Sequence, residues 1–202
     1  MKHRTEGRTP PDTTEKDLVQ KAKSGDATAF EMLVHRYDRQ VFSMAANYVS
    51  NAEDAKDIYQ EVFLRVYRAL PRFEFRSEFS TWLFRITTNV CLTHRTRKRK
   101  HGFAPLGTGE GDDDDVSHRA AAVAREERQT DEQALTNELG NSIDRALTQL
   151  SGKERMVFTL RHFDGLKVRE IAEIMHVTDG AVKKYLFTAT RKVRKHLKDF
   201  RE

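Results

Sequence analysis

The sequence has few of the residues that stabilise small secreted or metal-binding proteins. Its 202 residues include a single cysteine, Cys91. One thiol cannot form a disulfide framework or a zinc site with several thiolates, and on an apolar helix face it is most often a small core residue. Only 4 prolines and 10 glycines interrupt the chain. Because helix-forming residues dominate the remainder, we expect an all-α fold.

Long hydrophobic runs are also missing. No segment approaches the roughly 20 apolar residues that a membrane-spanning helix needs. The first residues, MKHRTEGRTPPDTTEKD, contain no apolar stretch, so we expect no signal peptide. These absences predict a cytoplasmic protein without membrane insertion.

The sequence shows no pattern typical of a catalytic or metal site. His35, His94, His162 and His176 are scattered without paired spacing, and the run Asp112–Asp115 lies in a Gly-rich segment. Metal ions need ligands that rigid elements hold in a fixed geometry. Phosphate-binding loops, nucleophile elbows and zinc-binding helices are missing too. We therefore predict no catalytic residue, metal or cofactor. A metal-dependent nuclease is the alternative, which magnesium-dependent DNA cleavage would reveal.

Charge is abundant: one-third of the residues are charged, and the net charge is +5. This balance favours a polyanionic partner, although many solvated helical proteins are equally basic. The segment FSTWLFRITTNVCLTHRTRKRK, from Phe79 to Lys100, is aromatic and apolar at first and basic afterwards, without any Asp or Glu. Such a segment could face a membrane, a protein or a nucleic acid.

Changes in composition along the chain predict two helical domains. An acidic, Gly-rich stretch between them is typical of a linker, although a short helix near Arg119–Arg128 is compatible with its sequence. The expected parts are a disordered tail at 1–14, a helical domain at 15–100, a flexible acidic linker at 101–136 and a helical domain at 137–202.

Capping residues mark the helices of the first domain. Asp26 and Asn51 are suitable N-caps for helices over 26–49 and 51–70, and Pro71 ends the second of these. An irregular patch follows, and Ser80 is the expected N-cap of the next helix. Apolar residues recur at steps of three and four, which predicts a buried stripe on each helix.

The second domain carries the pattern of a helix-turn-helix. A helix over 137–150 and a capping box at Ser151 and Glu154 precede a short helix, a corner at 176–178 and a longer helix. His176 stands in the corner where glycine is usual, so either it adopts a positive φ or the corner differs. The last helix presents a basic face, as a DNA-recognition helix does. An ordinary helical hairpin with a solvated basic face is the alternative.

Three segments in this order, NAEDAKDIYQEVFLRVYRAL, FEFRSEFSTWLFRITTNV and AVKKYLFTATRKVRKHL, resemble the extracytoplasmic-function (ECF) sigma factors. These form the small two-domain group of the main bacterial sigma factor family. The resemblance covers nearly all of 15–100 and 137–198. It implies a sigma factor that directs core RNA polymerase to promoters and is usually held inactive by an anti-sigma factor. A stand-alone helix-turn-helix regulator is the alternative.

The resemblance also implies where RNA polymerase binds. The helix 51–70 resembles the one that docks on the clamp helices of the β′ subunit, through Asp54, Asp57, Gln60 and Glu61. A solvated charged face is the alternative for each of these residues. The second domain is expected to contact the flap of the β subunit through Leu150, Met156 and Phe158, provided that these are exposed.

The loop 73–80 and the following helix resemble the element that reads the minus-ten promoter sequence. Extruding a base from duplex DNA costs a few kcal/mol, and stacking it on an aromatic ring returns about 1–3 kcal/mol. Phe73 and Phe79 could instead cover the end of the domain, and Trp82 could belong to the core. The expected contact residues are Phe75, Arg76, Ser77, Glu78, Phe79, Arg85, Asn89, Arg95, Arg97 and Lys98.

The helix-turn-helix is expected to read the minus-thirty-five element in the major groove. Tyr185 and Phe187 are bulky for such a face and could pack inward instead. Glu110 and Asp112–Asp115 in the linker could mimic nucleic acid in the RNA exit channel or serve only as a solubilising tether. The expected minus-thirty-five residues are Thr178, Asp179, Gly180, Lys183, Lys184, Phe187 and Arg191.

Overall fold

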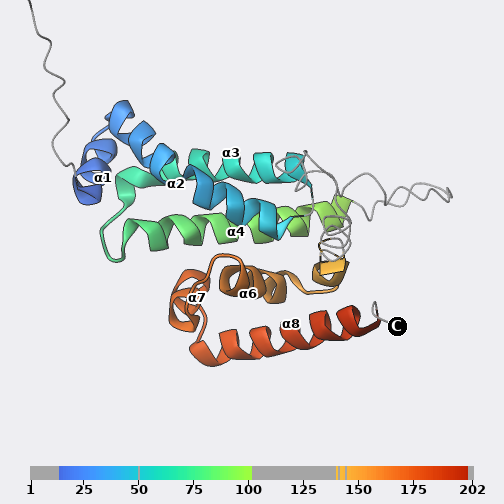
Figure 1. The fold of residues 1–202 in the computed structure, drawn as a ribbon. Helices are drawn as coiled ribbons and strands as arrows, with labels where there is room; N and C mark the ends of the chain where they lie inside the picture. Colours follow the sequence, from blue (N-terminus) through green and yellow to red (C-terminus); the bar gives the residue numbers. More distant parts are fainter. Residues whose placement is uncertain (1–13, 50, 102–139, 141, 144, 200–202) are drawn as a thin grey trace, which may run out of the picture.

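The computed structural model describes residues 14–49, 51–101, 140, 142–143 and 145–199, and every regular element in these ranges is a helix (Figure 1). The expected all-α fold is therefore confirmed for this part of the chain. Most of the expected tail and linker, with the aspartate run and the segment 119–128, lies outside the described residues. Among the described helices, none is long and apolar enough to cross a membrane.

The first three helices begin at side-chain caps. Helix α1 (Glu15–Lys23) follows Thr14, which forms a capping box with Asp17. Asp26 accepts the Ala29 N–H at the start of α2 (Ala27–Tyr48). Asn51 accepts the Asp54 N–H at the start of α3 (Ala52–Ala69). The N-caps expected at Asp26 and Asn51 are confirmed, because these side chains satisfy backbone donors that the helix itself cannot.

Pro71 lies in a short 3₁₀ turn, η1 (Leu70–Arg72), which ends α3 as expected. Helix α4 (Phe79–His101) then begins earlier than predicted. The Trp82 N–H donates to the Glu78 carbonyl at 3.2 Å, so Ser80 lies inside the first turn and is not the N-cap. The Phe79 ring is buried against Phe73, and this packing places residue 79 in the first turn of the helix.

The C-terminal segment contains α6 (Gly152–His162), α7 (Val168–Met175) and α8 (Asp179–Asp199). Residues 142–143 and 145–148 are helical and belong to the helix expected before α6. The Ser151–Glu154 capping box is confirmed. His176 has φ 52° and ψ 49°, so the helix-turn-helix forms with a histidine in the left-handed region.

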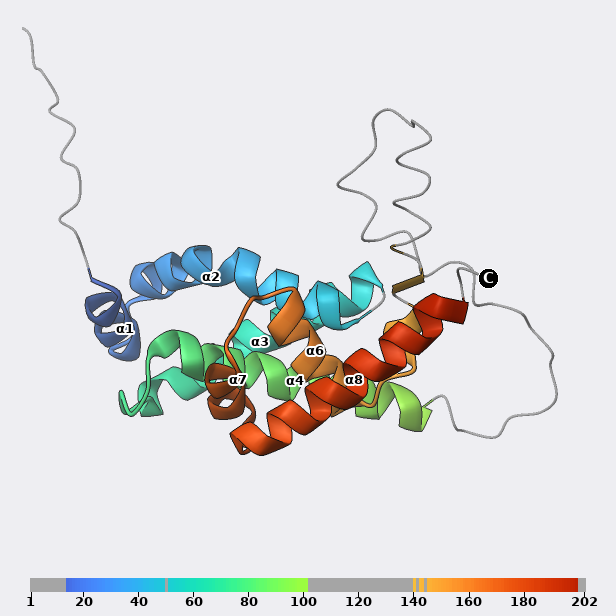
Figure 2. The ribbon, with the colours of Figure 1, turned by 60° about the horizontal axis from the view of Figure 1, so that its bottom comes forward.

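The two segments pack into one body. Figures 1 and 2 show α6 and α7 against α4, with α8 on the outer side, and α6 also touches α2. One buried cluster extends from α2, α3 and α4 through Met156 and Leu160 to Ile171 and Ala172. A second cluster joins the turn before α6 to α8 through Leu150 and Val193. Apolar burial therefore stabilises the contact between the segments as well as each segment.

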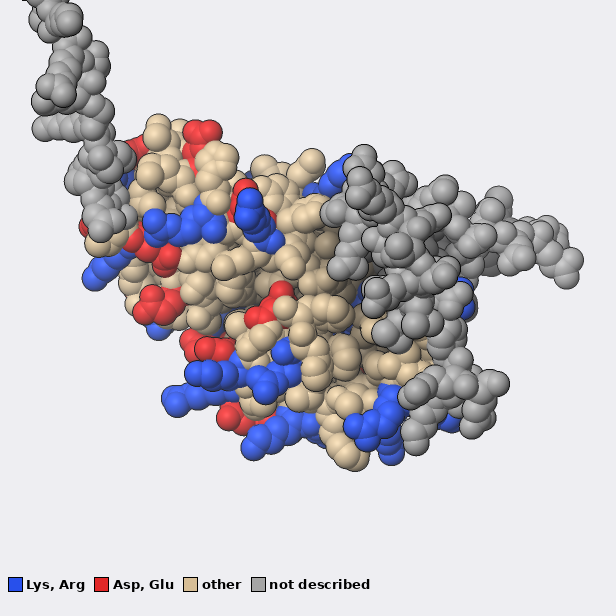
Figure 3. Space-filling model, viewed as in Figure 1, with Lys and Arg blue, Asp and Glu red and all other residues tan. Residues whose placement is uncertain are grey.

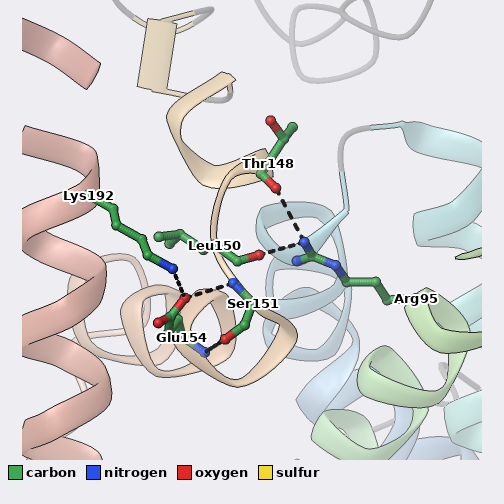
Figure 4. Close-up of polar contacts among 6 residues, drawn as sticks. All are labelled: Arg95, Thr148, Leu150, Ser151, Glu154 and Lys192. Atoms are coloured by element: carbon green, nitrogen blue, oxygen red, sulfur yellow. Dashed lines mark hydrogen bonds and ion pairs between the residues drawn. The ribbon is translucent and has the colours of Figure 1, made fainter. Parts of the chain in front are cut away.

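Polar groups fasten the same contact. Arg85 Nη2 donates to the Glu173 carbonyl at 3.2 Å. Arg95 Nη2 donates to the carbonyls of Leu150 at 2.6 Å and Thr148 at 3.4 Å (Figure 4). The approach is close at Gly152, where an added Cβ would lie 3.2 Å from Tyr48 Oη. We call this arrangement the closed form.

Candidate nucleic-acid and protein interfaces

The four polar residues singled out on α3 divide into two groups. Asp57 and Gln60 are exposed, and Glu61 accepts a hydrogen bond from Arg65 Nε at 2.6 Å. The Asp54 side chain is only 19% exposed, accepts from Lys98 Nζ at 2.6 Å and lies 3.6 Å from His94 Nε2. Asp54 therefore ties α3 to α4, whereas the other three remain open to a partner.

A groove of about 300 Å³ lies between α3 and α4 beside these residues. Asp57, Gln60 and Glu61 line one side, and His94 and Arg97 line the other. Leu64 also lines the groove and is 51% exposed. The sequence interpretation did not name Leu64, although it is an apolar residue off the buried stripe of α3. An exposed leucine among acidic groups is typical of a protein-binding surface.

A cluster of packed aromatic rings supports the loop between η1 and α4. Phe73 is buried, and its ring centroid lies 4.9 Å from those of Phe75 and Trp82. Phe79 is only 4% exposed, so it forms the floor of the loop. This matches the alternative in which Phe79 covers the end of the domain. Trp82 is half-buried and packs on Phe73 and Phe79.

Phe75 stands out of this cluster. It is 36% exposed and has φ 55°, a conformation that a bulky residue rarely adopts and that costs about 1–2 kcal/mol. Beside it, Arg76 is exposed and pairs with Glu74 at 2.7 Å. Ser77 is half-buried and Glu78 is exposed. The loop thus presents one ring with cationic, hydroxyl and carboxylate groups around it.

The expected basic residues of α4 do not share one environment. Asn89, Arg97 and Lys98 are exposed, and Lys98 pairs with Asp54. Arg85 and Arg95 instead donate to main-chain carbonyls of the C-terminal segment. Arg85 Nε and Arg95 Nη1 are buried without a hydrogen-bond acceptor in the described structure. Each of these two guanidinium groups is therefore partly buried in the closed form and incompletely satisfied.

The expected minus-thirty-five residues all lie at the surface. Thr178 Oγ1 accepts the Ala181 N–H at 3.2 Å, at the start of α8. Phe187 is 69% exposed, so it points outward, whereas Tyr185 is half-buried against the core. Figure 3 shows Lys and Arg side chains gathered over the lower part of the molecule, where α7 and α8 lie. The exposed set is Thr178, Asp179, Gly180, Lys183, Lys184, Phe187 and Arg191.

The expected contact with the β flap does not fit the closed form. Leu150 is buried in the cluster beneath α8, and Met156 is buried against Thr88 of α4. The prediction required both residues to be exposed, and neither is, because their side chains pack between helices of this chain. Phe158 is half-buried next to His162, and Phe163 is the exposed aromatic residue nearby.

Two family models match the chain in succession. The model for Sigma-70 region 2 matches residues 33–101, and the model for Sigma-70 region 4 matches residues 140–193. The first range contains most of α2, α3 and α4, and the second contains α6, α7 and most of α8. The fold and the order of its parts are therefore those of a sigma factor, a transcription initiation factor and not an enzyme.

Comparison with individual proteins shows to which group of sigma factors the chain belongs. RNA polymerase sigma-H factor of Pseudomonas aeruginosa is 31% identical over 92% of this chain and 95% of its own. ECF RNA polymerase sigma factor SigW of Bacillus subtilis is 31% identical over 91% and 97%. ECF RNA polymerase sigma-E factor of Escherichia coli K12 is 33% identical over 87% and 90%. The chain belongs to the ECF sigma factor family, as the sequence motifs indicated.

Solved structures share the fold over most of the chain. CnrH, in complex with the cytosolic domain of CnrY, is similar with a TM-score of 0.62 and 23% identity, over 92% of this chain and 97% of its own. RpoE of Bartonella quintana, in complex with the anti-sigma factor NepR, is similar with a TM-score of 0.57 and 18% identity, over 84% and 96%. At these identities the likeness concerns the fold alone.

Proposed function

We propose that the two halves of this sigma factor have separate tasks. Residues 15–100 dock on core RNA polymerase and recognise and melt the minus-ten element. Residues 137–202 recognise the minus-thirty-five element, and residues 101–136 connect the two. The observation that carries this proposal is the succession of region 2 at 33–101 and region 4 at 140–193 in one chain. Because the partner polymerase acts in the cytoplasm, the protein belongs there.

The polymerase-docking surface consists of the exposed side of α3. Asp57, Gln60 and Glu61 bind the clamp helices of the β′ subunit, and Leu64 supplies an apolar contact at their centre. Such a combination suits a protein interface, because buried apolar area supplies affinity while charges set orientation. Asp54 supports the surface by fastening α3 to Lys98 of α4. Phe163 replaces Leu150 and Met156 as the residue next to Phe158 that can reach the β flap.

The loop around Phe75 captures an unpaired base of the non-template strand. Phe75 offers the exposed ring, while Ser77 and Glu78 offer hydrogen-bonding groups for the edge of the base and Arg76 a cation for its phosphate. Aromatic stacking worth about 1–3 kcal/mol per base is of the size needed to offset extrusion. Phe79 supports the loop from below. Asn89, Arg97 and Lys98 continue the contact along the strand.

The exposed face of α8 reads the minus-thirty-five element. Lys183, Lys184 and Arg191 contact base edges and phosphates, and Phe187 fits the methyl group of a thymine. Thr178, Asp179 and Gly180 lie at the N-terminus of α8, the end that enters the groove in a helix-turn-helix. The exposure of all these side chains supports the assignment.

The closed form is the resting form of the free protein. Arg85 and Arg95 cannot donate to the carbonyls of Glu173 and Leu150 and to DNA phosphates at the same time. Promoter binding therefore requires the two segments to separate. While this sigma factor is held inactive, an anti-sigma factor covers the docking surface on α3. The solved complexes of CnrH with CnrY and of RpoE with NepR motivate this extension.

Gel filtration with core RNA polymerase tests the proposed docking surface. We expect the chain to co-elute with the polymerase and to direct run-off transcription from a genomic library, which also yields the promoter sequence. The double variant Asp57→Lys and Glu61→Lys should weaken association by at least tenfold, because two contacts become repulsive. Glu53→Lys is the matched control, since Glu53 is an exposed acid in the first turn of the same helix.

Two outcomes would contradict the proposal. If the chain does not associate with core polymerase, it is not the docking partner that α3 implies. If the double variant binds as well as Glu53→Lys, the docking surface lies elsewhere. A stand-alone regulator would instead bind duplex DNA tightly without polymerase, which an electrophoretic shift with the selected promoter detects.

A further inference from the structure

Helix α1 brings two lysines to the loop that carries Phe75, and neither belongs to a motif identified in the sequence. Lys23 Nζ donates to the main-chain carbonyl of Phe73 and lies 5.0 Å from the centroid of the Phe75 ring. Lys16 Nζ lies 6.0 Å from the same centroid. Both ammonium groups are within the range of a cation–π interaction. The loop is therefore fastened to α1 as well as to α4.

Lys23 explains how Phe75 keeps its unusual conformation. A phenylalanine with φ 55° persists only where its surroundings restrain it. Lys23 provides restraint at two points, because the same ammonium group holds the carbonyl of Phe73 and the face of the Phe75 ring. The Phe73 ring packs against Phe75 as well, with centroids 4.9 Å apart. Lys23 is thus positioned to fix the direction in which Phe75 projects.

Lys16 has a different environment. It is exposed, and its ammonium group lies at the outer limit of contact with the ring. Single-stranded nucleic acids bind where an aromatic ring stacks on a base and a nearby cation contacts the backbone. Among the described residues, only Lys16 and Lys23 lie over the Phe75 ring. Besides Arg76 of the loop itself, Lys16 is therefore a second cation with freedom to reach a phosphate next to a base stacked on Phe75.

Helix α1 is a firm support for these lysines. Leu18 and Val19 are buried against α2, and the Tyr37 hydroxyl of α2 donates to the Glu15 carboxylate. Burial, together with the Glu15 carboxylate, raises the pKa of Tyr37 above its usual range. Contacts with η1 complete the attachment.

We propose that α1 forms one wall of the single-strand site, in which Lys23 positions the Phe75 loop and Lys16 binds a phosphate of the captured strand. This inference rests on the proposed capture of the non-template strand by the same loop. The ligand is single-stranded DNA, in which one base stacks on Phe75 and the adjacent phosphate faces α1. Lys23 is a positioning residue, and Lys16 is a direct contact.

Salt dependence tests the role of Lys16. The probe is a fluorescent single-stranded oligonucleotide with the minus-ten segment of the promoter returned by the transcription experiment, bound to the holoenzyme at about 50–200 mM salt. Loss of one phosphate contact should reduce the slope of log affinity against log salt by about 0.7. We expect this for Lys16→Gln and no change for Lys21→Gln, an exposed lysine of the same helix. Equal slopes for the two variants would overturn the role of Lys16.

A base-specific comparison tests Lys23. The wild-type holoenzyme should prefer the intact oligonucleotide to one that is abasic at the everted position. Lys23→Met should abolish this preference, because Phe75 loses its support, while Lys23→Arg should retain it. Lys16→Gln should weaken both probes equally. A preference that persists in Lys23→Met shows that Lys23 does not position the loop, and so contradicts the proposal.

Controls separate this inference from the function on which it rests. Thermal unfolding of each variant monitors folding, and the exposed Lys16→Gln variant tests the wall independently if Lys23→Met is unstable. If the wild-type holoenzyme itself does not distinguish the intact probe from the abasic one, capture by the Phe75 loop fails. If it does distinguish them and both lysine variants behave as wild type, only the role of α1 fails.

Discussion

At the scale of single residues, the two non-glycine residues with positive φ among those described are Phe75 and His176. The two residues have different roles. Phe75 projects from the loop that we assign to strand capture, whereas His176 closes the corner between α7 and α8. The sequence indicated a backbone requirement at His176, because glycine is usual there. It gave no such signal at Phe75, where the conformation depends on Lys23, Phe73 and Trp82 around the loop.

Replacing Phe75 by glycine separates function from stability. The variant loses the ring but also the strain of a positive φ, so the free energy of unfolding should change by no more than about 1 kcal/mol. Loss of stacking worth about 1–3 kcal/mol should reduce the fraction of open promoter complexes by about fivefold or more. Permanganate footprinting and thermal unfolding measure the two effects. Phe42→Ala, at an exposed phenylalanine of α2 outside the proposed binding surfaces, should leave promoter opening unchanged, and an equal loss there would refute the assignment.

His176 allows a test in both directions. His176→Gly should raise the free energy of unfolding by about 0.5–1 kcal/mol, because glycine adopts the left-handed region without a Cβ clash. His176→Val should lower it by about 1–2 kcal/mol, since a β-branched residue tolerates this region least. Urea denaturation of both variants checks the order. If valine is tolerated as well as glycine, the corner is not strained.

At the scale of elements, the joint between α6 and α8 combines a helix cap with an ion pair. Glu154 accepts the Ser151 N–H at 2.8 Å and Lys192 Nζ at 2.8 Å (Figure 4). Burial alone would raise the pKa of Glu154, but the hydrogen bonds from Lys192 and Ser151 outweigh it and lower the pKa. The capping box was readable from the sequence. The partner Lys192, 38 residues away, was not, because only folding brings α8 to this cap.

The lowered pKa of Glu154 gives the sign of a pH effect. Its carboxylate stabilises the fold above the unfolded pKa of about 4.3, and this contribution is lost as the pH falls through the lower, folded value. Glu154→Gln should therefore reduce stability at pH 7 and flatten the loss of stability on acidification. Lys192→Met should cost about 1 kcal/mol, discounted for its partly exposed side chain. Urea denaturation at pH 7 and at about pH 3 measures both; unchanged pH dependence in Glu154→Gln contradicts the assignment.

At the scale of the whole molecule, the closed form decides which surfaces are free. It leaves the docking face of α3, the Phe75 loop and the outer face of α8 exposed. It partly buries Arg85 and Arg95, whose guanidinium groups bind carbonyls instead of anions. A partly buried cation with one nitrogen left without an acceptor destabilises the state that contains it. DNA phosphates are better partners, so promoter binding should favour separation of the two segments.

A bulky residue at Gly152 should open the molecule. An added Cβ would already lie 3.2 Å from Tyr48 Oη and 3.3 Å from Leu92 Cδ2, so Gly152→Gln crowds the contact and forces these side chains to shift. Glutamine is nevertheless a better helix former than glycine, so α6 itself is not weakened. We expect a larger radius of gyration by small-angle scattering and stronger binding of the free chain to single-stranded DNA. Lys153→Gln, at the exposed neighbouring position, should remain closed and bind as wild type.

The sequence alone determined the local structure. Asp26, Asn51, Pro71 and the Ser151–Glu154 box set helix ends, because caps and proline act on backbone groups within a few residues. The three sequence motifs, in their order along the chain, also identified the family. The tertiary structure alone decided which predicted contact residues are available. Phe79, Leu150 and Met156 became core residues, Arg85 and Arg95 became links between segments, and Lys16 and Lys23 came to the Phe75 loop. Burial and pairing depend on residues that are distant in the chain, and helical periodicity carries no information about them.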